Sequence, residues 1–101
     1  MNNSERLKGM IGIAKRGGFV TYGEDMFHRL NRRKLPLIIV ANDISPRAKK
    51  DLSAAIDDKQ LIMSYLTKRE LGELIAARPV NAIGINSAGI ARKIIELQKE
   101  E

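Results

Sequence analysis

The stretch Leu35–Ala41 contains no polar side chain and includes three consecutive β-branched residues, Ile38 to Val40. A run of this length and composition is typical of a central strand that is covered on both faces. Pro36 is compatible with the entry of such a strand but not with its middle, because proline cannot donate a ladder hydrogen bond. The rest of the chain therefore has to supply helices for both faces of a sheet.

Helical and extended patterns alternate around this strand. Helices are predicted over residues 4–15, 24–33, 46–57, 68–77 and 88–97, and further strands over 19–21, 61–66 and 80–85. Ser45-Pro46 is a typical helix start, Thr67 and Glu70 have the spacing of a capping box, and Asn86 or Ser87 is expected to cap the last helix. This alternation predicts an α/β fold, a three-layer α/β/α sandwich with a parallel or mixed sheet.

The length of 101 residues predicts a single domain spanning 1–101. The chain has no cysteine and one histidine, so we expect no metal site, no cofactor and no thiol or histidine-based catalysis. No apolar run approaches the ~20 residues of a membrane span, and the polar first residues do not resemble a signal peptide. We therefore expect a cytoplasmic protein without a membrane partner.

The positive charge is concentrated in the first half of the chain. The net charge is +6, but residues 1–50 hold 11 basic and 4 acidic side chains, whereas residues 51–101 hold 7 and 8. An asymmetry of this kind favours a polyanionic partner, although lysines that merely keep a small domain soluble give the same composition. The basic clusters are Lys15-Arg16, Arg29 with Arg32-Arg33-Lys34, and Arg47 with Lys49-Lys50.

The motifs that would indicate an enzyme are incomplete. Gly84 and Gly89 have the spacing of a phosphate-binding loop, but Ile90-Ala91 follows where Lys-Ser/Thr is needed. Gly9 and Gly12 have the spacing of a nucleic-acid clamp, but they lie inside a predicted helix, where we expect them to face another element closely. No nucleophile, base and orienting group occur together, so we expect no enzymatic activity.

The start of the second predicted helix is the best candidate for a binding site. Gly23 precedes Glu24-Asp25, and a glycine there lets a ligand approach the free N–H groups of the first turn. Arg29 and the basic residues 32–34 continue the helix. The pattern favours contacts to phosphates or base edges.

The order of motifs along nearly the whole chain resembles the kink-turn RNA-binding family of large-subunit ribosomal proteins, the L7Ae/L30e type, and especially its small bacterial YlxQ-like branch. The matching pieces are Leu7 with Ala14-Lys15-Arg16-Gly17-Gly18, Val20 with Gly23-Glu24-Asp25, Arg29-Leu30-Asn31-Arg32, Leu37–Asp43, Leu71-Gly72 and Ala77-Arg78-Pro79-Val80.

The resemblance implies a mixed four-stranded sheet and binding to a sharply kinked RNA. We further expect a monomer that is associated with the ribosome or with translation. It implies that the helix start after Gly23 reads guanines, that Arg29 contacts phosphate, and that the loop Arg78–Val80 covers a flipped-out nucleotide. The residues expected to contact RNA are Gly18, Thr21, Gly23, Glu24, Asp25, Arg29, Arg32, Arg33, Arg78, Pro79 and Val80.

Three positions depart from the family pattern. Strong binders have Asn and Glu where this chain has Asp25 and Met26, and a glycine is usual where it has Ala76. We expect both Asp25 and Met26 to be exposed, so that Asp25→Asn with Met26→Glu strengthens kink-turn binding with little effect on folding. Two other functions remain open: a module whose basic face docks an acidic protein, and a nucleotide or nucleic-acid enzyme with an unrecognised site.

Overall fold

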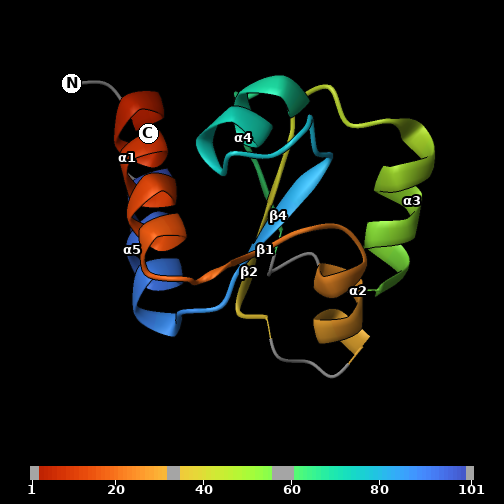
Figure 1. The fold of residues 1–101 in the computed structure, drawn as a ribbon, viewed down its shortest axis with the longest axis horizontal. Coiled ribbons are helices and arrows are strands. Elements are labelled where there is room, and N and C mark those ends of the chain that lie inside the picture. Colours follow the sequence, from red (N-terminus) through yellow and green to blue (C-terminus); the bar gives the residue numbers. More distant parts are fainter. Residues whose placement is uncertain (1–2, 32–34, 56–60, 100–101) are drawn as a thin grey trace.

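A computed structural model describes residues 3–31, 35–55 and 61–99 of the chain (Figure 1). The elements are α1 (Asn3–Arg16), β1 (Val20–Thr21), α2 (Gly23–Asn31), β2 (Leu37–Val40), α3 (Pro46–Ala55), β3 (Leu61–Met63), α4 (Lys68–Leu74), β4 (Ala82–Ile85) and α5 (Ala88–Lys99). The mixed α/β architecture expected from the sequence is confirmed.

The sheet is mixed and has the strand order β1-β4-β2-β3. β2 is parallel to β3, with Val40 opposite Met63, and antiparallel to β4, with Val40 opposite Ala82. β1 is antiparallel to β4 at the edge. The carboxyl ends of β2 and β3 and the beginning of β4 therefore lie at the same end of the sheet.

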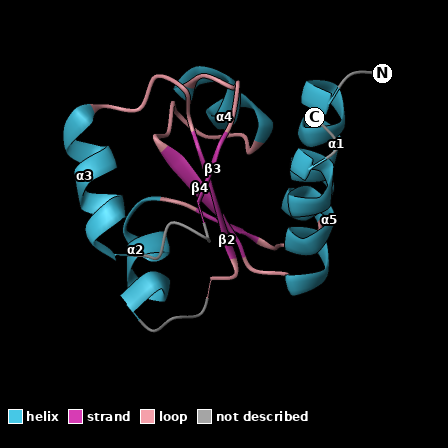
Figure 2. Cartoon of the chain, turned by 180° about the vertical axis from the view of Figure 1, so that it is seen from behind, coloured by secondary structure: helices cyan, strands magenta, loops and turns pink. Residues whose placement is uncertain are grey.

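Helices cover both faces of the sheet, which makes three layers (Figures 1 and 2). α1, α4 and α5 bury side chains such as Ile11, Leu71 and Ile94 on one face, against Ile39 and Ile83. α2 and α3 bury Met26 and Leu52 on the opposite face, together with Ile38. Every residue of β2 and β4 is buried, as the apolar run in the sequence predicts.

The strands are shorter than the sequence pattern predicts. β1 holds only two residues because Gly18 and Gly23, both with positive φ (78° and 64°), turn the chain on either side of it. β3 ends at Met63, and the chain then turns at Ser64. The Ser64 N–H and hydroxyl both donate to the Val40 carbonyl, at 3.0 Å and 2.8 Å, and the hydroxyl accepts from the Leu66 N–H at 3.2 Å, a bond to a residue only two positions on that an extended strand does not make. Three strands thus form the body of the sheet, and β1 is a short addition at its edge.

The expected helix caps are present. Ser45 accepts from the Ala48 N–H at 3.2 Å, and Ser87 does the same for the Ile90 N–H. Thr67 and Glu70 form the predicted capping box at the start of α4. The Thr67 N–H, and the Lys8 ammonium of α1 at 3.4 Å, hold the pKa of the Glu70 carboxyl below its usual range.

α4 ends earlier than expected, at Leu74, in a tight reversal of the chain. The Ala77 N–H donates to the Gly72 carbonyl at 2.8 Å, and the Ala76 N–H donates to the Glu73 carbonyl at 3.3 Å. This pair of bonds is a Schellman motif, which needs a left-handed residue at the position of Ala76. Ala76 has φ 56°, which explains why glycine is usual there.

We expect Ala76→Gly to stabilise the protein by about 0.5–1 kcal/mol. The substitution removes the cost of ~1–2 kcal/mol for a left-handed alanine, and the greater chain entropy of glycine offsets part of that gain. Thermal unfolding should shift upward by several degrees. Ala54→Gly, the same change at a right-handed position in the last turn of α3, should instead lower stability, by up to about 1 kcal/mol. Equal effects of the two substitutions would contradict this role of Ala76.

The expectation that Gly9 and Gly12 face another element closely is wrong. A Cβ added at either position would meet no atom within 4 Å outside the helix's own backbone. Gly9 is exposed and Gly12 is half-buried. Neither glycine of α1 is therefore required by packing.

Candidate nucleic-acid interface

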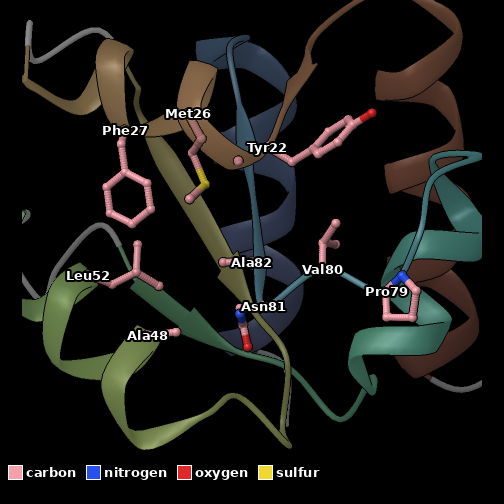
Figure 3. A pocket seen from close by; sticks show the side chains of 10 residues that line it. Tyr22, Met26, Phe27, Ala48, Leu52, Pro79, Val80, Asn81 and Ala82 are labelled. Atoms are coloured by element: carbon pink, nitrogen blue, oxygen red, sulfur yellow. The ribbon is translucent and has the colours of Figure 1, made fainter.

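A pocket of about 240 Å³ opens between the start of α2, the inner side of α3 and the chain that enters β4 (Figure 3). Ten residues line it: Tyr22, Gly23, Met26, Phe27, Ala48, Leu52, Pro79, Val80, Asn81 and Ala82. Its walls are mostly apolar, and it lies at the end of the sheet where β2 finishes and β4 begins. A pocket of this kind suits a flat, partly apolar ligand group held by few polar contacts.

The pocket joins two segments that are far apart in the sequence. Gly23 lies on one side, and Pro79 and Val80 lie on the other. The loop is fixed by the Val80 N–H, which donates to the Lys68 carbonyl at the start of α4 at 3.1 Å. The structure thus brings together the helix start and the loop that the resemblance assigns to RNA contact.

Gly72 of α4 packs closely against the backbone of this loop. A Cβ at Gly72 would lie 2.3 Å from the Arg78 carbonyl oxygen and 2.7 Å from its carbon. These are backbone atoms, which cannot rotate away as a side chain can. The absence of a side chain at Gly72 therefore sets the position of Arg78 and of the loop that follows.

The first turn of α2 faces solvent. Gly23, Glu24 and Asp25 are all exposed, and the space around Gly23 is open. The N–H groups of a first helical turn have no partner within the helix, so this turn offers donors to an anion or a base edge. The two carboxylates stabilise the helix through its dipole, and they add negative charge at the rim of the pocket.

Cations without an ion pair lie on the two helices that line the pocket and on the loop beside it. Arg29 of α2, Arg47, Lys49 and Lys50 of α3, and Arg78 are exposed. Within the described ranges none of them forms an ion pair. On the opposite side of the sheet, by contrast, Lys8 pairs with Glu70 and Arg69 pairs with Glu73. Lys15 and Arg16 of α1 and Arg92 and Lys93 of α5 are also exposed and without an ion pair within the described ranges, so free cations lie on both sides of the sheet, and five of them belong to the elements that line the pocket.

Several residues predicted for the site lie elsewhere. Thr21 is 8% exposed, and its hydroxyl is buried without a hydrogen-bond partner. Its side chain lies against Gly84 of the neighbouring strand and has no surface to offer an RNA. Gly18 is exposed in the turn after α1, outside the pocket. Arg32 and Arg33 lie outside the described residues.

The prediction that Met26 is exposed is wrong, and the prediction that Asp25 is exposed is confirmed. Asp25 is exposed, whereas Met26 is 3% exposed and packs in the core under α2 with Leu52 and Ile38. Neighbouring positions on a helix point in different directions, and the second of the two faces inward. A carboxylate at Met26 would therefore enter the core instead of the solvent.

Seven of the ten lining residues were not among the RNA contacts predicted from the sequence, and three of them show why. Tyr22 is 43% exposed beside Gly23, Leu52 comes from α3, and Asn81 lies at the entry of β4. An aromatic residue next to a helix-starting glycine is a signal that could have pointed to Tyr22. The contribution of Leu52 depends on how α3 packs, which no local pattern encodes.

Residues 3–31, 35–55 and 61–99 contain neither a candidate metal site nor a candidate membrane-spanning helix. No three His, Cys, Asp or Glu side chains come together as metal ligands do. Among the same residues, no helix has the length and apolar character needed to cross a membrane.

These features define a small α/β/α sandwich with a pocket at one end of its sheet and free cations on the elements that line it. The chain belongs to the Ribosomal protein L7Ae/L30e/S12e/Gadd45 family, whose profile matches residues 5–95. The family that the sequence motifs indicated is thus confirmed. No curated protein matches the chain.

Solved structures share the fold at low sequence identity. A protein with unknown function from Bacillus halodurans superimposes with a TM-score of 0.79 at 22% identity, over 91% of this chain and 95% of the other. The Giardia lamblia 15.5kD RNA binding protein superimposes with a TM-score of 0.69 at 22% identity, over 94% of this chain and 89% of the other.

Proposed function

We propose that this protein binds structured RNA with a sharp kink, of the kink-turn kind, without catalysing a reaction. One observation carries the proposal: the pocket joins the exposed first turn of α2 to the Arg78–Val80 loop. A kinked RNA presents both features that such a site can use, a dense phosphate ridge and an unstacked base. The family supports an RNA partner, and the similar Giardia protein is described as RNA-binding.

Each part of the site has a role in the proposed complex. Arg29, Arg78 and the cations of α3 neutralise phosphates, which supplies affinity without sequence preference. The first turn of α2 from Gly23 to Asp25 meets base edges, and the apolar walls of the pocket enclose the unstacked base. We further propose that the protein acts as a monomer in the cytoplasm, in association with the ribosome or translation.

The test is a comparison of a kink-turn RNA with a straight duplex of equal length. We expect tighter binding to the kinked RNA at every salt concentration. Neutralisation of about 4–6 phosphates predicts that log K falls with log salt with a slope of order −3 to −5. Equal affinity for both RNAs would reduce the protein to a generic basic surface and overturn the proposal.

A matched pair of variants separates the site from the rest of the surface. Arg29→Ala should weaken binding to all RNAs by a similar factor and make the salt slope shallower by about one. Arg92→Ala, an exposed arginine of α5 on the other side of the sheet, should change neither the affinity nor the slope. A similar loss for both variants would mean that the charge of the whole protein, not this face, governs binding.

A further inference from the structure

Among the described residues that line the pocket, two have a polar side chain, Asn81 and Tyr22. Figure 3 shows the Asn81 amide between Ala48 and Val80. Asn81 is half-buried, so its polar atoms can meet a ligand but are partly shielded from water. Which group of the Asn81 amide is free, the oxygen or the NH₂, therefore determines whether the pocket offers a ligand an acceptor or a donor.

Two bonds hold Asn81 in place. Its backbone carbonyl accepts from the Ala41 N–H at 2.9 Å, at the end of β2. Its side-chain oxygen accepts from the Ser45 N–H at 3.3 Å, just before α3. The second bond orients the amide, because only the oxygen can accept from an N–H. The NH₂ group is left over, and it makes no hydrogen bond within the described part of the chain.

We infer that the pocket selects, through the Asn81 amide, an unstacked base with a carbonyl group in place of the exocyclic amino group of cytosine and adenine, that is uracil or guanine. This inference rests on the proposed function. The free group of Asn81 is a donor, and uracil O4 and guanine O6 are acceptors. Cytosine and adenine carry an amino group at the corresponding position, which would set one donor against another.

Because the surroundings are apolar, this single hydrogen bond determines the difference in affinity between bases. Met26, Leu52 and Val80 line the pocket and offer a base no alternative hydrogen bond through their side chains. A polar group of the base that enters without a partner loses its hydration and gains nothing in return. A site built to pair one group therefore rejects the analogue that cannot pair with it.

The experiment uses four kink-turn RNAs that differ only in the unstacked nucleotide: U, G, C or A. We expect the wild-type protein to bind the U and G forms roughly two- to tenfold more tightly than the C and A forms, the effect of one neutral hydrogen bond. Asn81→Asp keeps an oxygen for the Ser45 N–H but makes the free group an acceptor, so the preference should reverse. Asn81→Leu should abolish it.

A control variant removes the effect of charge. Ser53→Asp adds the same negative charge at an exposed position of α3, outside the pocket lining, and it should weaken binding of all four RNAs by one common factor. Equal affinities of the wild-type protein for the four kinked RNAs, together with a retained preference over duplex, would overturn the base selection alone. Loss of the preference for kinked RNA would overturn the proposed function as well.

Discussion

Gly72→Ala is expected to destabilise the protein by about 3 kcal/mol, at the upper end of the usual cost of overpacking. The added Cβ would lie 2.3 Å from the Arg78 carbonyl oxygen and 3.0 Å from that of Ala77. Both are backbone atoms held by further bonds, including that of the Ala77 N–H to the Gly72 carbonyl. Relief of the overlap requires the loop to move away from α4. The measurement is urea and thermal unfolding, in which the midpoint should fall by more than 10 °C.

Gly9→Ala is the matched control for this substitution. It makes the same chemical change within a helix, but at an exposed position with open space. Because alanine is the better helix former, the variant should be more stable than the wild type by up to about 1 kcal/mol. Opposite signs for the two substitutions are the expected result. A Gly72→Ala protein as stable as the wild type would show that the loop does not depend on this close approach.

Met26→Glu is expected to destabilise the protein by about 4 kcal/mol at pH 7. The side chain is 3% exposed, and an isolated carboxylate in such a place loses its hydration without gaining a partner. Burial raises the pKa of the introduced carboxyl, so the folded protein binds its proton more tightly than the unfolded chain does. The destabilisation should therefore be smallest near pH 4 and should grow as the pH rises. Unfolding curves at several pH values measure it.

Two milder substitutions test whether the buried charge causes the destabilisation by Met26→Glu. Met26→Leu keeps the volume and the apolar character and should cost less than about 1.5 kcal/mol at any pH. Asp25→Asn changes an exposed side chain and should alter stability by no more than about 1 kcal/mol, the loss of a favourable charge at the helix start. A Met26→Glu protein with normal stability at pH 7 would contradict the buried position of this residue.

Much of the fold could be predicted because its determinants are local. The apolar run at β2, the capping box of Thr67 and Glu70 and the serine caps of α3 and α5 depend on residues close together in the sequence. Strand ends were less predictable because they depend on distant partners. Ser64, just after the end of β3, bonds through its hydroxyl to Val40, 24 residues away, and this pairing leaves no trace in the local pattern.

The candidate site could be predicted only in part. Gly23 and the segment Arg78–Val80 were placed together by the resemblance to a family, since their own sequences contain no sign that they meet. The burial of Thr21 and Met26 depends on which way one strand and one helix are turned about their axes. Asn81 was missed because its role depends on a bond to Ser45, 36 residues away.

The sheet divides the described interior into two unequal parts. Between the sheet and α2 and α3 the buried residues are Met26, Leu35, Ile38, Val40, Leu52 and Ala82, a much smaller set than the one on the other face. Detachment of α2 and α3 therefore exposes less apolar area than detachment of α1 and α5, and it costs less free energy. Amide protons of α2 and α3 should accordingly exchange with solvent through opening events that leave α1 and α5 closed. A ligand that contacts α2, α3 and the loop beside them binds only the closed form, so it slows that exchange in proportion to its concentration over its dissociation constant. Binding of such a ligand would therefore make the layer of α2 and α3 more rigid.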